Sequence, residues 1–353
     1  MRIILIILDG CPVSPLKKAE TTFINEIIQK GNYNFDCEAV FPTATYTGHS
    51  SIITGCYPNR TGMVGNQFYD RKDKITKHFD NFDPNIHIEA RTIFEYLSSM
   101  KPVSICEPIY KGAYKKITMK EIHKNPIKSR NELIYRDSKK YIEKESINFI
   151  MINFSAVDSI GEIFGPNSKE YKETIETVDN YIRNLYNISH SIDETILIIT
   201  ADHGLTEIKS TFNLQQDLSN NGFNLICCPS HRICHIYSQS DKIEDLILYL
   251  KENRKIKHVF NKNDIKKLKI GHNRSGDLLV VANDNIEFEV KGLKGSHGGL
   301  NSEEMKVPLL ILGPNRYKFN LMNSRIIDIL PTILDILKIK PKKKLDGKSL
   351  LIK

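Results

Sequence analysis

Five short apolar segments recur along the chain and predict buried strands. They cover residues 3–8, 103–106, 147–154, 195–200 and 307–312, and turn residues bound each of them. Apolar runs of this length are typical of strands that are buried on both faces of a sheet. Segments with apolar residues at helical spacing lie between them and predict helices at 22–30, 90–100, 131–145, 171–189 and 325–337.

Buried strands that alternate with helices predict an α/β fold, a doubly wound and mainly parallel sheet with helices on both faces. The stretch 206–294 differs, because its strand signals at 232–237, 277–281 and 286–290 are short and polar loops join them to one helix at 241–252. The alternation of buried strands and helices that is typical of the main sheet resumes at residue 307. We therefore expect a catalytic α/β domain of residues 1–205 and 295–353, with an inserted α+β cap at 206–294.

The composition is that of an ordinary globular protein, with 353 residues of which 40% are hydrophobic and 26% charged. The formal net charge is +8, but the lysines are scattered, so we expect no nucleic-acid duplex as partner. No stretch approaches the ~20 apolar residues that cross a bilayer, which predicts no membrane partner. The seven cysteines show no disulfide or zinc spacing and favour a cytoplasmic location.

Carboxylates and histidines follow several of the predicted strands. Asp9 follows the first strand, Asp158 the third, and Asp202 with His203 the fourth, while His297 precedes the last. In a doubly wound sheet the ligand site lies outside the carboxyl ends of the strands, so these side chains are expected to converge. Carboxylate and imidazole groups together are the ligands of a divalent metal centre.

A nucleophile is available in the hydroxyl-rich segment 41–55, which opens a predicted helix. The N-terminus of a helix presents unpaired N–H groups and a positive dipole end, so it is a ready phosphate site. Threonines at this position are also ordinary helix caps, and the segment alone does not separate the two roles.

Several separated motifs resemble the alkaline phosphatase superfamily, in particular its nucleotide pyrophosphatase/phosphodiesterase branch. They occur in the expected order and are Asp9-Gly10, Phe41-Pro-Thr-Ala-Thr45, Thr54-Gly55-x-Tyr57-Pro58, Gly62-x-x-x-Asn66, Asp158-x-x-Gly161, Ala201-Asp202-His203-Gly204 and Ser296-His297-Gly298. The resemblance implies an alkaline-phosphatase-like fold and two divalent metal ions, zinc in the family.

The resemblance also implies a role for each matching residue. Thr45 would be the nucleophile and a ligand of one metal, which the side chains of Asp9, Asp202 and His203 also hold. The second metal would be held by Asp158 and His297. Asn66 would hydrogen-bond a phosphoryl oxygen, and Tyr46 would offer an aromatic face to a nucleobase.

The chain departs from the family pattern at three places. Glu162 stands where the family has a histidine ligand; it lies four residues after Asp158, so on a helix both carboxylates face the same way. We expect Glu162 to bind the second metal and to make the site harder, favouring manganese over zinc. The second departure is Thr47-Gly48 before His49. His49 lies one helical turn after Thr45 and is a candidate substrate-binding residue. The third departure is at 106–108, where the chain lacks the aromatic residue that many family members carry at the matching position.

The expected activity is metal-dependent cleavage of a phosphate diester or pyrophosphate bond in a small phosphate ester such as a nucleotide. Two alternatives of the same superfamily are a phosphonoacetate-type carbon–phosphorus hydrolase and a phosphomonoesterase. A non-catalytic protein that binds a phosphate ligand is the alternative from a different class.

Overall fold

A seven-stranded sheet forms the centre of the computed structural model, which describes every residue except 145–146, 239–242, 289 and 353. The strand order is β2-β17-β8-β1-β7-β5-β6. The strands span Arg2–Ile7 (β1), Tyr33–Glu38 (β2), Val103–Ile105 (β5), Lys115–Ile117 (β6), Phe149–Asn153 (β7), Thr195–Thr200 (β8) and Lys306–Leu312 (β17). All five strands predicted from apolar runs are present in this sheet.

The sheet is mainly parallel, as predicted, but one strand runs the other way. β1 pairs in parallel with β7 and β8, and β5 pairs in parallel with β6 and β7. β17 is antiparallel to both of its neighbours, β8 and β2. The chain enters β17 from the loop that carries His297, which lies at the carboxyl ends of the parallel strands, so β17 must run back across the sheet.

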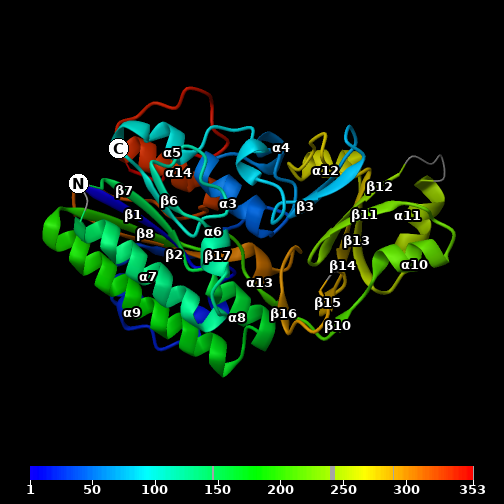
Figure 1. Cartoon of the computed structure of the whole chain (residues 1–353), viewed down its shortest axis with the longest axis horizontal. Coiled ribbons are helices and arrows are strands. Elements are labelled where there is room, and N and C mark those ends of the chain that lie inside the picture. Colours follow the sequence, from blue (N-terminus) through cyan, green and yellow to red (C-terminus); the bar gives the residue numbers. More distant parts are fainter. Residues whose placement is uncertain (145–146, 239–242, 289, 353) are drawn as a thin grey trace.

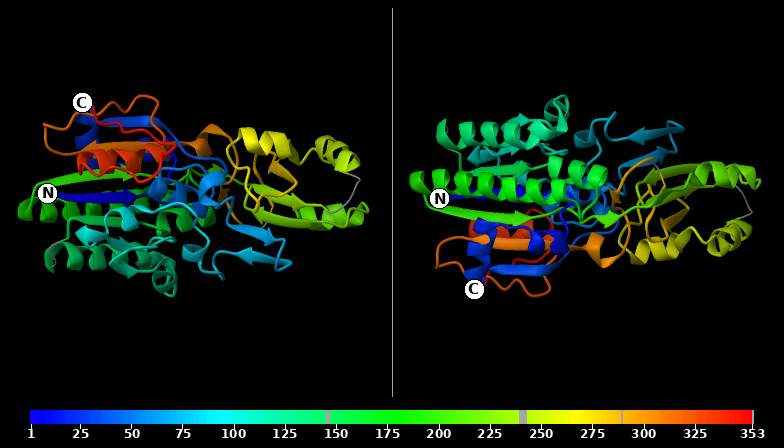
Figure 2. Two further views of the ribbon diagram at one scale, coloured as in Figure 1. Left: turned by 90° about the horizontal axis from the view of Figure 1, so that it is seen from above. Right: turned by 90° about the horizontal axis from the view of Figure 1, so that it is seen from below.

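Helices cover both faces of the sheet, which confirms the predicted doubly wound α/β class. Figure 2 shows one face in each panel. One layer contains α1 (Val13–Lys18), α2 (Thr22–Gln29), α7 (Ile127–Lys144) and α9 (Lys169–Ile192). The other contains α3 (Thr45–Thr54), α5 (Ile93–Tyr96) and α14 (Ile329–Ile336). In the described ranges no helix is both long and apolar enough to span a bilayer.

A second, four-stranded sheet lies beyond one end of the first (Figure 1). Its order is β11-β12-β14-β13, with bounds Ile226–Ser230 (β11), Ile233–Tyr237 (β12), Ile256–Asn261 (β13) and Leu278–Ala282 (β14). α10 (Leu214–Asn220), α11 (Ile243–Glu252) and α12 (Lys262–Lys267) accompany it. All of these elements fall within 206–294, and β9 (Thr206–Glu207) pairs with β16 (Gly295–Ser296) where the chain leaves and re-enters the main part.

Several elements differ from the sequence expectation. The segment 90–100 forms only the four-residue α5 and a 3-10 turn, Ser98–Met100, which ends where Lys101 takes a positive φ of 52°. The expected strand at 286–290 is reduced to β15 (Ile286–Glu287). Parts of three expected elements lie outside the described residues. They are Glu145 at the end of the helix 131–145, Asp241 and Lys242 at the start of the helix 241–252, and Glu289 in the strand 286–290.

Shorter elements complete the chain. The hairpin of β3 (Gln67–Asp70) and β4 (Ile75–His78) contacts β11, and β10 (Ser210–Thr211) pairs with β15. The remaining helices are α4 (Pro58–Thr61), α6 (Met119–His123), α8 (Ala156–Phe164) and α13 (Ser302–Met305), with 3-10 turns at Pro84–Ile86 and Ile326–Asp328.

Candidate active site at the carboxyl ends of the strands

Three carboxylates meet where the central parallel strands end. Asp9 follows β1, Asp202 follows β8, and Asp158 lies in the first turn of α8 just after β7. The positive φ of Gly10 (60°) turns the chain directly after Asp9, and a Cβ there would lie only 2.2 Å from Asp158 Oδ1. A glycine at position 10 therefore allows Asp158 to approach the end of β1.

Thr45 is the first residue of α3 and lies beside this cluster. Its Oγ1 is 3.3 Å from His203 Nε2. Ala44 precedes the helix and cannot cap it with its side chain, so the positive end of the α3 dipole faces the same space as the Thr45 hydroxyl. The close approach of α3 depends on Gly48, because a Cβ at that position would lie 2.6 Å from the Asp202 carbonyl oxygen.

The two histidines of the motifs are held with their Nε2 atoms toward the cluster. His203 donates from Nδ1 to the Gly204 carbonyl (3.0 Å), and His297 donates from Nδ1 to the Thr43 carbonyl (2.8 Å). Burial lowers the pKa of His203 to about 4 and holds the pKa of His297 well below its usual value. Both rings are therefore neutral, with the Nε2 lone pair available, which is the form that binds a metal.

Several buried oxygen atoms that have no hydrogen-bond partner among the described residues line the cluster. They include Asp9 Oδ1, Asp158 Oδ1 and Asp202 Oδ2. Burial and neighbouring negative charge raise the pKa of Asp158 and of Asp202 well above the usual range. Such an excess of buried acceptors is costly unless cations offset it. The donor set, carboxylates with neutral imidazoles, fits divalent metal ions.

Glu162 reaches the far side of the same cluster. It lies one helical turn after Asp158 in α8, and its Oε1 is 3.9 Å from His297 Nε2. The same oxygen is 3.7 Å from Nδ1 of His231, a residue that lies in the turn between β11 and β12. The structure therefore brings Glu162 next to His297, and it adds a histidine from a distant segment.

His49 lies inside the protein, between the carboxylates and Glu107. Its Nδ1 is 2.7 Å from Glu107 Oε2, and its Nε2 is 3.6 Å from Asp202 Oδ2 and 3.9 Å from Asp9 Oδ2. Burial alone would lower the pKa of His49, but the charges of Glu107 and Asp202 raise it well above its usual value. His49 is fully buried beside Asp9 and Asp202, with which it forms a group spaced as metal ligands, and within the described residues it does not line the neighbouring cavity.

Asn66 connects the start of α3 to β11. The side-chain Oδ1 of Asn66 accepts from the Tyr46 backbone N–H (3.4 Å). The backbone N–H of Asn66 donates to Ser230 Oγ (2.9 Å). With Oδ1 engaged, the Nδ2 group is the part of the side chain available to donate to a ligand at Thr45. The structure thus places the predicted Asn66 beside the predicted nucleophile.

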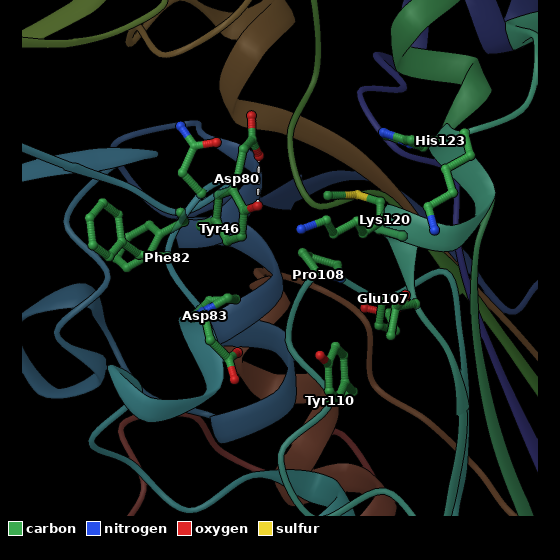
Figure 3. Close-up of a pocket in the computed structure, with 15 residues that line it drawn as sticks. Tyr46, Asp80, Phe82, Asp83, Glu107, Pro108, Tyr110, Lys120 and His123 are labelled. Carbon is green, nitrogen blue, oxygen red and sulfur yellow. Dashed lines mark hydrogen bonds between the residues drawn. The ribbon is translucent and has the colours of Figure 1, made fainter.

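A cavity of about 640 Å³ adjoins the cluster at Tyr46 (Figure 3). Tyr46 Oη donates to Asp80 Oδ1 (2.8 Å). Tyr110, Lys120 and His123 line the same cavity, and none of them belongs to a motif that predicted the site. Tyr110 could have been found by the strand-end argument, since it follows β5 by a few residues; Lys120 and His123 lie on the short helix α6 and give no comparable signal.

Solved structures share this fold over the whole chain. An inactive threonine-to-alanine variant of murine ectonucleotide pyrophosphatase/phosphodiesterase 5, in complex with AMP, matches with a TM-score of 0.82 at 18% identity, and the match covers 100% of both chains. The wild-type alkaline phosphatase PafA matches with a TM-score of 0.81 at 16% identity, covering 99% of this chain and 98% of that one. These likenesses confirm the alkaline-phosphatase-like fold.

Curated relatives and a family model agree with the fold. The rat ectonucleotide pyrophosphatase/phosphodiesterase family member 7 is 24% identical over 89% of this chain and 78% of its own. The human bis(5'-adenosyl)-triphosphatase ENPP4 is 25% identical over 96% of this chain and 79% of its own. The model of the type I phosphodiesterase / nucleotide pyrophosphatase family matches residues 3–302. With that match over most of its length, the chain belongs to the type I phosphodiesterase / nucleotide pyrophosphatase family of hydrolases.

Proposed function

We propose that this hydrolase cleaves a phosphate diester or pyrophosphate bond of a nucleotide, with Thr45 as the nucleophile and two divalent metal ions. The observation that carries the proposal is the placement of Thr45 Oγ1 at the N-terminus of α3, 3.3 Å from His203 Nε2 and beside a buried cluster of carboxylates. AMP in the inactive variant of the murine relative, and the dinucleoside substrate in the name of the human relative, support a nucleotide.

The residues of the cluster divide into two sets of ligands. Thr45, Asp9, Asp202 and His203 would hold one ion, and Asp158, Glu162 and His297 the other. When bound, such a pair lowers the pKa of a coordinated hydroxyl and offsets charge on the attacking and leaving oxygens of an in-line displacement. The unpartnered oxygens of the three aspartates support this assignment.

The chain's own groups would carry the remaining steps. Thr45 Oγ1 forms a bond to phosphorus as the ester oxygen leaves, which gives a phosphothreonine intermediate that water then hydrolyses. Asn66 Nδ2 and the N-terminus of α3 stabilise negative charge on the non-bridging oxygens. Tyr46 and Tyr110 offer aromatic surface in the adjoining cavity, where a nucleoside would pack.

Diesters are expected to react faster than monoesters. A monoester carries one more negative charge, and among the described residues no lysine or arginine hydrogen-bonds or ion-pairs with Thr45 or Asn66. We expect kcat/KM for a nitrophenyl nucleotide diester to exceed that for nitrophenyl phosphate by at least ~10-fold. The measurement compares both with phosphonoacetate. A tenfold preference for the monoester, or cleavage of phosphonoacetate alone, would identify one of the other hydrolase types.

The identity of the metal is expected to depend on Glu162. A carboxylate in place of an imidazole adds negative charge and makes the site harder, which favours manganese relative to zinc. We expect the metal-free protein to regain more activity with manganese than with zinc, and Glu162→His to reverse that order. Activity is measured after adding each ion to protein freed of metal by a chelator. Glu162→Ala with unchanged metal content and rate would exclude Glu162 as a ligand.

A further inference from the structure

The second metal site contains a histidine that the sequence motifs do not include. Glu162 occupies the position where the family pattern has a histidine, so the motifs supply one histidine ligand fewer to the second metal than the family pattern does. His231 lies in the turn between β11 and β12, about seventy residues later in the chain, and its side chain enters the same cluster.

The atoms of three side chains are spaced as metal ligands. His231 Nδ1 and His297 Nε2 lie 3.7 Å and 3.9 Å from the same oxygen, Oε1 of Glu162. The centroids of the two imidazole rings are 4.1 Å apart, and the three ligand atoms lie within 4.8 Å of one another. Ligands ~2.0–2.1 Å from a tetrahedral ion are ~3.4 Å apart, so the two nitrogen distances to Glu162 Oε1 need to shorten by only a few tenths of an ångström.

A buried atom aimed into this group supports a ligand there. His297 Nε2 is fully buried and has no hydrogen-bond partner in the part of the chain that the structure describes, while its Nδ1 donates to the Thr43 carbonyl. A neutral imidazole fixed in this way presents a lone pair to the space between Glu162 and His231.

The turn that carries His231 is fixed against the loop of His297. His231 has a positive φ of 58°, an uncommon conformation for a residue other than glycine. The Arg232 N–H donates to the His297 carbonyl (2.9 Å), and a Cβ on Gly298 would lie 2.8 Å from the Ser230 carbonyl oxygen. Strained backbone persists where the surroundings hold it in place, and it is concentrated at functional sites.

We propose that His231 is a ligand of the second metal and supplies the imidazole that Glu162 replaces. The inference rests on the proposed function, and it makes the ligand set Asp158, Glu162, His231 and His297. One ligand then comes from the inserted segment 206–294, so metal binding fastens the cap to the main sheet. Glu287 Oε1 lies 3.7 Å from His231 Nδ1, so the competing arrangement is a metal-free pair of His231 with Glu287.

The test measures metal binding by the full chain. Metal-free wild type, His231→Ala and His258→Ala are titrated with zinc in competition with a chromogenic chelator. His258 lies on β13 of the cap and is absent from the cluster, so it is a matched control. We expect two zinc equivalents in wild type and in His258→Ala. In His231→Ala the affinity for one equivalent should fall by roughly 100-fold or more, above the usual effect of a residue that only orients a ligand.

Two further measurements separate a ligand from a structural residue. The visible spectrum of the cobalt-substituted protein should change in His231→Ala, because water replaces a nitrogen ligand. Adding Glu162→His to His231→Ala should restore the zinc affinity, and thermal unfolding verifies that each variant is folded. Two wild-type sites that persist with unchanged affinity and spectrum in His231→Ala would contradict the assignment of His231 alone. Wild-type protein that binds no divalent ion would contradict the proposed function itself.

Discussion

Replacing Thr45 with alanine is expected to reduce kcat by at least ~10³-fold while leaving the free energy of unfolding nearly unchanged. The hydroxyl is the proposed nucleophile, and alanine offers no atom that can form the bond to phosphorus. The Thr45 side chain is only partly buried, and its hydroxyl contacts His203. Thr45→Ser keeps a hydroxyl and should retain measurable turnover. The measurement is kcat for the nucleotide diester, with urea unfolding of each variant.

Thr47→Ala is the matched control for this prediction. Thr47 lies in the same helix and is buried, and its hydroxyl has no hydrogen-bond partner within the described ranges. The substitution therefore removes the same atoms without touching the proposed nucleophile. It should keep near wild-type kcat. Thr43 is unsuitable as a control, because its Oγ1 bonds to Gly298 and Gly299 in the loop of His297. An active Thr45→Ala variant would show that another group attacks phosphorus.

Replacing Arg232 with methionine is expected to destabilise the protein by about 3–5 kcal/mol. Arg232 is only 1% exposed and Glu304 is fully buried, and Arg232 Nε donates to Glu304 Oε1 at 3.0 Å. The guanidinium also donates to the Asn283 and Ile286 carbonyls. Because these carbonyls lie in the segment 206–294 and Glu304 lies in α13, Arg232 connects that segment to α13 beside the site. Without it, a carboxylate stays buried with no opposite charge. The measurement is the free energy of unfolding in urea.

The double variant Arg232→Met/Glu304→Gln should recover much of that loss, because it also removes the uncompensated charge. The amide oxygen of the glutamine that replaces Glu304 can still accept from the Gly299 N–H, as Glu304 Oε1 does at 2.7 Å. Arg316→Met is the surface control: Arg316 pairs with Glu194 in an exposed position, and exposed ion pairs contribute little. A cost below ~1 kcal/mol for Arg232→Met would mean that solvent or a neighbouring cation reaches Glu304.

The sequence by itself determined the architecture of the main sheet and predicted which strand-end residues lie together. Apolar runs such as the one that forms β8, Thr195–Thr200, can be stable only when both faces are covered, so the runs indicate a doubly wound sheet. Asp9, Asp158 and Asp202 are detectable because parallel strands carry whatever follows them to one edge. Thr45 and Asn66 were identified by resemblance to the family, and their roles remain predictions.

Only the tertiary structure decided which residues complete that site from elsewhere in the chain. His49 is one helical turn from Thr45, which predicted contact with substrate, yet the approach of α3 to Asp202 and Glu107 encloses it. His231 comes from a turn whose local sequence gives no sign of a site, whereas Tyr110 follows β5 but belongs to none of the motifs. Local periodicity determines which face of a helix or strand is buried. Which distant residues contact that face depends on how separate elements pack, and no short-range sequence pattern encodes that packing.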